Sequence, residues 1–122
     1  MSKPRSKLFP YAEQALRTVR GYTTAIHFGR QSKHMPGHPN HDSSKSPISA
    51  PLPVLQQLLD LHAGTGRWFG KHKEVVDFGT TIGNYSDPET GEEFPTTVGT
   101  IHYSKSGAHV VPTSPRSTSR SR

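Results

Sequence analysis

Residues 101–112 combine ionisable side chains with the pattern of a β-hairpin. Two short runs of β-branched and aromatic residues flank a turn, which is typical of paired strands. The segment also carries His102, Tyr103, Ser104, Lys105 and His109. The pairing of two strands does not require so many ionisable groups. Histidine titrates near neutrality and lysine keeps a positive charge, so this segment could move protons and hold a phosphate.

A second group of such residues lies far from the hairpin in sequence and consists of Arg30, Lys33 and His34. We expect folding to bring this group next to the hairpin. His34 and His109 are then the expected proton-transfer pair, because each stands in a cluster of charged and polar residues. The isolated histidines are expected to be ordinary hydrogen-bonded residues, and these are His27, His62 and His72.

The length of the hairpin turn decides which histidines share a face of the sheet. A two-residue loop would pair His102 with His109, so that both rings face one side with Cβ atoms roughly 5 Å apart. Gly107 also suits a type I turn with a G1 bulge, which would pair Tyr103 with His109 and turn His102 to the opposite face. We favour the bulge, with His109 as the catalytic histidine of the hairpin. His102 remains the candidate of the other register.

Composition limits the class of protein. The chain has 122 residues, of which 30% are hydrophobic, with 11 Gly and 11 Pro, so we expect one loop-rich domain with a small core. The absence of cysteine excludes disulfides and thiolate metal sites. A net charge of +6 favours a polyanionic partner. No signal peptide or membrane span is visible, and we expect action in the cytoplasm, including that of a target cell after delivery.

The elements that must position these residues are expected to form an α+β domain. N-terminal helices would pack on a four-stranded antiparallel meander sheet, with a long polar loop from Gly29 to Pro53. The expected helices are Tyr11–Arg20 and Leu52–Ala63. The expected strands are Glu74–Phe78, Ile82–Ser86, Thr96–Ser104 and Ala108–Val111, with a turn at Asp87–Gly91. The domain would span residues 11–112, between a disordered basic N-terminus (1–10) and a disordered Ser/Arg tail (113–122).

Two blocks of sequence carry a resemblance to a known family. Residues 33–37 read Lys-His-Met-Pro-Gly, and residues 102–109 read His-Tyr-Ser-Lys-Ser-Gly-Ala-His. With the helix and turn motifs between them, these blocks resemble the polymorphic toxin type 50 domain over roughly residues 26–112. That domain is found at the C-termini of bacterial polymorphic toxins and phage minor head proteins. The resemblance implies a barnase–EndoU–colicin–RelE type fold and a metal-independent ribonuclease.

If the resemblance holds, the candidate residues can be assigned to the steps of RNA cleavage. Cleavage of RNA by its own 2′-OH requires a base, an acid and cations for the phosphorane charge. The expected catalytic residues are His109, His34, Lys33 and His102. The expected substrate-binding residues are Lys105, Ser104, Thr100, Tyr103 and Arg30. Tyr103 would stack a base, whereas Ser104 and Thr100 would donate hydrogen bonds to phosphate oxygens. We expect a monomer that acts on RNA without a cofactor and is restrained by an acidic immunity protein.

Two alternatives remain open at the level of sequence. The spacing of His34, His38, His41 and Asp42 supplies enough ligands for zinc, although Pro36 and Pro39 break any helix that would align them. We therefore expect no metal site. The second alternative is a non-catalytic basic nucleic-acid-binding or virion-associated module, which the charge fits equally well.

Overall fold

A four-stranded antiparallel sheet lies at the centre of the computed structural model, which describes residues 18–36 and 45–115. The fold is α+β, as expected, but its first described element is a β-hairpin and not a helix. The strands are β1 (Thr18–Val19), β2 (Tyr22–Thr23), β3 (Arg67–Phe69), β4 (Lys73–Asp77), β5 (Gly83–Ser86), β6 (Glu93–Thr96), β7 (Val98–Ser104) and β8 (Gly107–Pro112). The helices are α1 (Phe28–Gln31), the 3₁₀ helix η2 (Ser32–His34) and α2 (Leu52–His62).

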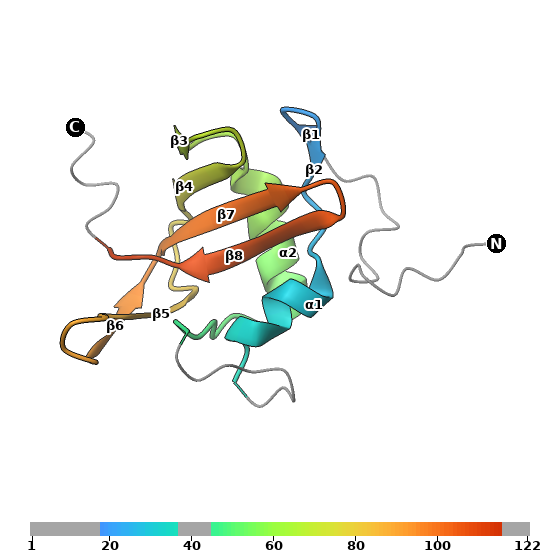
Figure 1. The fold of residues 1–122 in the computed structure, drawn as a ribbon. Helices are drawn as coiled ribbons and strands as arrows, with labels where there is room; N and C mark the ends of the chain where they lie inside the picture. Colours follow the sequence, from blue (N-terminus) through green and yellow to red (C-terminus); the bar gives the residue numbers. More distant parts are fainter. Residues whose placement is uncertain (1–17, 37–44, 116–122) are drawn as a thin grey trace.

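Helix α2 covers one face of the central sheet, whose strand order is β3-β4-β7-β8 (Figure 1). Its periodic apolar residues predict both the helix and the buried face. Leu55 and Leu59 are fully buried and share the core with Ile101 and Val110. The helix ends before Gly64, whose φ of 93° is favourable for glycine alone. No described helix covers the opposite face of the sheet (Figure 1).

The β7–β8 hairpin has the two-residue loop Lys105–Ser106, so the bulged register favoured from the sequence is wrong. His102 pairs with His109, and Ser104 pairs with Gly107, which takes a φ of 135° at the start of β8. Burial of apolar side chains explains why the hairpin takes this register and not the bulged one. In this register Ala108 and Val110 point into the core, and a slip of one residue would turn both of them to the opposite face.

The predicted four-stranded meander is also corrected. The predicted strand Ile82–Ser86 begins at Gly83 as β5 and pairs with β6 in a separate two-stranded sheet, with an isolated bridge from Gly83 to Ile48. The fourth strand of the central sheet is β3, which the sequence analysis did not predict. Both edges of β4 are occupied, by β3 and β7, so the chain after Gly79 cannot return beside it. The predicted turn at Asp87–Gly91 joins β5 to β6.

The N-terminal part of the fold differs from the prediction as well. The expected helix Tyr11–Arg20 is wrong at its end, because Thr18 and Val19 pair with Thr23 and Tyr22 across a turn in which Arg20 has a φ of 54°. Four predicted segments lie outside the described residues: residues 11–17 of that helix, the N-terminus 1–10, residues 116–122 of the predicted tail (113–122), and residues 37–44 of the predicted loop. The helices α1 and η2 replace the first part of that loop.

Two buried glutamines join the helices to extended backbone. The side-chain amide of Gln31 donates to the Val110 carbonyl (2.9 Å) and accepts from the Val110 N–H (2.7 Å). Gln56 accepts from the N–H of Ile26 (2.9 Å) and donates to the carbonyl of Thr24 (2.8 Å). The segment thus held pairs with β8, since His27 N–H donates to the carbonyl of Ala108. These contacts close the outer edge of β8.

The described chain contains no helix with the length and apolar character needed to span a bilayer. The longest one, α2, has 11 residues, whereas a span requires about 20.

Replacing Gln56 by Ala should lower the free energy of unfolding by about 2–6 kcal/mol, because two buried backbone groups lose their partner at roughly 1–3 kcal/mol each. Urea denaturation measures this. Gln57→Ala is the matched control, since Gln57 is the exposed neighbour on the same helix, and should change the unfolding free energy by less than about 0.5 kcal/mol. Equal midpoints for the two variants would contradict the role given to Gln56.

Candidate active site

Helix η2 places His34 against the central sheet. His27 caps the N-terminus of the preceding α1, where its side chain accepts a hydrogen bond from the N–H of Arg30, and α1 ends at Gln31, which is bound to Val110. His34 follows three residues later and is only 6% exposed. Its Nδ1 lies 3.1 Å from the Ser46 carbonyl oxygen. A carbonyl can only accept, so Nδ1 carries the proton and the orientation of the ring is set.

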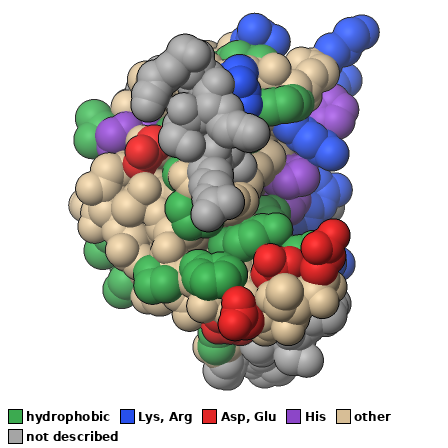
Figure 2. Space-filling view, turned by 90° about the vertical axis from the view of Figure 1, so that its left-hand side faces the viewer, with side chains coloured by type: hydrophobic (Ala, Val, Ile, Leu, Met, Phe, Trp, Pro, Cys, Tyr) green, Lys and Arg blue, Asp and Glu red, His purple; other side chains and the backbone are tan. Residues whose placement is uncertain are grey.

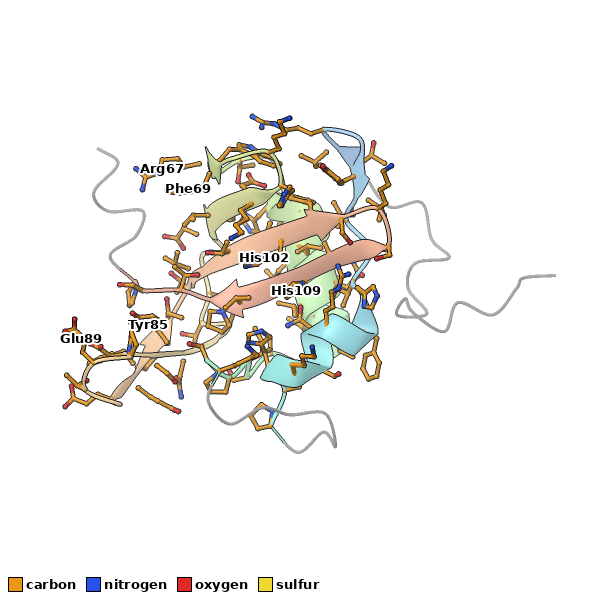
Figure 3. All side chains as sticks on the ribbon, viewed as in Figure 1. Arg67, Phe69, Tyr85, Glu89, His102 and His109 are labelled. Carbon is orange, nitrogen blue, oxygen red and sulfur yellow. The ribbon has the colours of Figure 1, made fainter. Side chains whose placement is uncertain are left out.

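Three imidazole rings lie in a row across η2, β8 and β7. The ring of His34 stacks on that of His109 with centroids 6.0 Å apart. The ring of His109 stacks on that of His102 at 4.8 Å, with 14° between the planes. The two-residue loop produces this second contact, because it places both residues opposite each other on the face that α2 leaves open (Figure 3). Folding thus brings His34 and His109 together, and His102 joins them.

A groove of about 470 Å³ lies beside two of these rings. It is lined by Tyr22, Arg30, His72, Lys73, His102, Tyr103, Ser104, Lys105 and His109. Within the described chain, this lining holds three Lys or Arg side chains and three histidines but no carboxylate. Figure 2 shows Lys, Arg and His gathered along the right-hand edge, where the open face of the sheet lies, with a group of Asp and Glu side chains below. The groove therefore suits an anion.

The same surroundings keep two of the histidines neutral. Burial, with the nearby charges of Lys73, His34 and His72, lowers the pKa of His102 from 6.5 to about 4. The pKa of His109 is lowered to about 3, mainly by burial and to a smaller extent by the charges of neighbouring histidines and of Arg30. Both rings are therefore uncharged at pH 7, in the form that can accept a proton.

Several predicted binding residues lie at the groove. Arg30 donates from Nη1 to the Ser104 hydroxyl (3.1 Å), and that hydroxyl donates to the Gly107 carbonyl (2.7 Å). Lys105 lines the groove at the hairpin loop. The contact of Arg30 with Ser104 ties α1 to the strand end next to the hairpin loop.

Other predicted residues are placed differently. Lys33 is exposed on η2 and is not among the residues that line the groove. Thr100 lies away from the groove lining, where its hydroxyl contacts that of Thr113 at 2.7 Å. Thr113, which the sequence analysis assigned to the tail, also donates its N–H to the Val98 carbonyl.

Tyr103 has its ring faces occupied by other aromatic rings. It stacks between Tyr22, at 5.8 Å, and Trp68, at 5.2 Å. Its hydroxyl donates to the buried carboxylate of Glu74 (2.7 Å), which also accepts from the N–H groups of Gly64 and Gly66. The residue is only 4% exposed. This geometry leaves little of the ring for stacking a base and gives Tyr103 a role in joining α2 to the sheet.

The sequence analysis missed three residues of the groove. Lys73 pairs with His102 across the sheet, but this is visible only once β4 is known to lie beside β7. His72 was taken for an isolated histidine, yet it lines the groove just before β4. Tyr22 belongs to a hairpin where a helix was expected to end.

The zinc alternative falls largely outside the described residues, since His38, His41 and Asp42 lie there and only His34 is described. Within residues 18–36 and 45–115, no three His, Cys, Asp or Glu side chains are grouped so as to hold a metal ion. A second hollow of about 390 Å³ is lined by Lys45 and Glu93 among others and contains no described histidine. The histidine groove is therefore the candidate active site.

The ring protons of His102 and His109, followed by NMR as the pH is lowered, should titrate near pH 4 and pH 3, well below an ordinary histidine at 6.5. Replacing His102 by Ala should raise the pKa of His109, because it removes a like charge and opens the ring to water. Titration of both rings near pH 6.5 in the unmodified protein would contradict this account of the groove.

The comparison with protein families identifies the chain. The family model described as bacterial toxin 50 matches residues 26–112, a segment that holds α1, η2, α2, the central sheet and the three stacked histidines. No curated protein sequence matches the chain significantly. The match covers most of the chain and agrees with the resemblance found from residues 33–37 and 102–109. The protein therefore belongs to the bacterial toxin 50 family.

Proposed function

We propose that this member of a toxin family is a metal-independent endoribonuclease, which cleaves RNA through attack by the 2′-OH on the neighbouring phosphorus. The observation that carries the proposal is the pair of stacked, neutral histidines, His102 and His109, facing a groove lined with cations. Acid–base cleavage of a phosphodiester requires two such groups within reach of one phosphate. Ring centroids 4.8 Å apart meet that requirement.

The reaction can be written with these two side chains. Neutral His109 takes the proton of the 2′-OH as the 2′-oxygen bonds to phosphorus. Protonated His102 gives its proton to the leaving 5′-oxygen as the P–O5′ bond breaks. The products are a 2′,3′-cyclic phosphate and a 5′-hydroxyl end, with one proton moved from His102 to His109. Exchange with water restores both rings.

The substrate itself supplies the charge that makes His102 an acid. In the free protein its pKa is lowered to about 4 by burial and by the neighbouring positive charges. A phosphate bound between Lys73 and the histidines offsets those charges and favours the imidazolium. Lys73, Arg30 and Lys105 would then stabilise the additional negative charge of the phosphorane.

His34 fits a positioning role better than direct acid–base work. It is 6% exposed, it is not among the residues that line the groove, and its ring stacks on that of His109 at 6.0 Å. Its bond to the Ser46 carbonyl holds the ring in place. We propose that His34 orients His109 and keeps it desolvated. Lys33 remains a predicted phosphate contact.

Purified protein should cleave total RNA and tRNA in excess EDTA and leave 2′,3′-cyclic phosphate ends, because the proposed chemistry needs no metal. His109→Ala and His102→Ala should each reduce the cleavage rate by at least about 100-fold. End-group analysis and gel electrophoresis measure both effects.

His62→Ala is the matched control, since His62 packs on Phe78 at 5.7 Å and is not part of the groove lining. Its cleavage rate should stay close to that of the unmodified protein. Intact RNA with a salt-sensitive gel shift would favour the nucleic-acid-binding module instead. Cleavage only after addition of zinc or magnesium would contradict the metal-independent mechanism.

The pH dependence should differ between the two kinetic constants. The profile of kcat/KM reports the free enzyme, whose histidines have pKa values of about 3 and 4, so kcat/KM should fall as the pH rises above about 4. The profile of kcat reports the complex, in which bound phosphate raises the pKa of His102, so its optimum should lie at higher pH. Steady-state rates on a short oligonucleotide from pH 4 to 9 measure both kinetic constants. Superimposable pH profiles of kcat and kcat/KM would refute the proposed rise of the His102 pKa on phosphate binding.

A further inference from the structure

A single row of side chains crosses the open face of the central sheet. Phe69 on β3 pairs with Lys73 on β4, Lys73 pairs with His102 on β7, and His102 pairs with His109 on β8. Residues that are directly opposite in an antiparallel sheet point to the same side. The row therefore runs from the paired histidines, past one lysine, to an aromatic ring at the free edge of the sheet.

Phe69 is placed where it contributes little to the core. It lies on a three-residue edge strand, is 49% exposed and is not part of the buried cluster. The guanidinium of Arg67 lies over its ring, 5.1 Å from the centroid. Figure 3 shows both residues at the β3 edge, with His102 and His109 further along the same face. An exposed aromatic ring between two cations is the surface that single-stranded nucleic acids use for stacking.

The spacing fits a nucleotide beyond the cleaved bond. Adjacent strands are about 4.8 Å apart, so Phe69 stands roughly 10 Å from His102, two strands away. With the scissile phosphate between the histidines and Lys73, the Lys73 ammonium can also meet the next phosphate, and Phe69 can meet the base of the nucleotide that follows it. The groove lining already includes Lys73, which connects the two regions.

We propose that Phe69, together with Arg67 and Lys73, forms a subsite for one nucleobase of single-stranded RNA that flanks the cleaved dinucleotide. This inference rests on the proposed function of the histidine groove and adds to it a preference for extended, unpaired substrates. The ring stacks on the base and is indifferent to its identity, because every nucleobase offers a π-face. The two cations contact the phosphates on either side.

Another exposed phenylalanine supplies the matched control. Phe94 on β6 is 41% exposed, close to the value for Phe69. Its surroundings have the opposite charge, since it shares a small hollow with Asp87 and its neighbour on the strand is Glu93. Phe94 therefore tests what the loss of an exposed aromatic ring does where no polyanion would bind.

The experiment compares Phe69→Ala and Phe94→Ala on two single-stranded substrates, a dinucleotide and a decanucleotide with one cleavable position. For Phe69→Ala, the ratio of kcat/KM for the decanucleotide to that for the dinucleotide should fall about tenfold, the loss expected for one base–aromatic stack. Phe69→Trp should restore it. Phe94→Ala should keep the ratio of the unmodified protein, and urea denaturation should show that both alanine variants are folded. An unchanged ratio in Phe69→Ala would overturn the subsite.

A binding measurement separates this inference from the proposed reaction. A fully 2′-deoxy decanucleotide lacks the attacking hydroxyl, and its fluorescence anisotropy reports binding without cleavage. Phe69→Ala should raise its Kd about tenfold and Phe94→Ala should not. If the unmodified protein cleaves no RNA and Phe69→Ala still weakens this binding, the reaction is refuted and the subsite stands. If the unmodified protein cleaves RNA and Phe69→Ala binds the deoxy decanucleotide with the same Kd as the unmodified protein, the subsite is refuted and the proposed reaction stands.

Discussion

The structure depends on the pairing of two side-chain amides with main-chain groups. A side-chain amide carries both donor N–H groups and an acceptor oxygen, so a buried glutamine can replace a short stretch of β-strand. Gln31 does this for Val110, 79 positions away in sequence, and Gln56 does it for the backbone of Thr24 and Ile26. Because Gln31 is the last residue of α1, its bonds determine where η2 begins and thus where the ring of His34 meets His109.

Charge is divided between two parts of the described molecule. The histidine groove holds Arg30, Lys73 and Lys105, whereas Asp87, Glu89, Glu92 and Glu93 lie in or beside the β5–β6 turn. Catalytic histidines in many enzymes are oriented by a carboxylate, which raises their basicity. Here a backbone carbonyl holds His34, ring stacking joins His34, His109 and His102, and cations line the groove beside the last two. Among the described residues, the groove lining therefore has no anionic counter-ion, which is the role proposed above for the substrate phosphate.

Features set by local sequence were predictable, and features set by distant contacts were not. The helix Leu52–His62 and the strands β7 and β8 follow from apolar periodicity and turn residues. The register of the hairpin does not, because Gly107 suits both turns and the burial of Ala108 and Val110 decides between them. Strand β3 has only three residues, too few for a pattern. The grouping of charged and polar residues around His34 and around His109 was enough to predict that these two histidines meet. The place of Lys73 beside His102 could be found only from the order of the strands.

The long separation between the two halves of the histidine row has a consequence for synthesis of the protein. The ring of His34 is made early, but its partner His109 and the backbone of Val110 that holds α1 are added almost at the end of the matched segment, residues 26–112. While the last strand is still being made inside the ribosome, the row cannot assemble. A chain that is truncated before residue 109 therefore lacks the paired rings, and the complete site can form only after translation of this segment is finished.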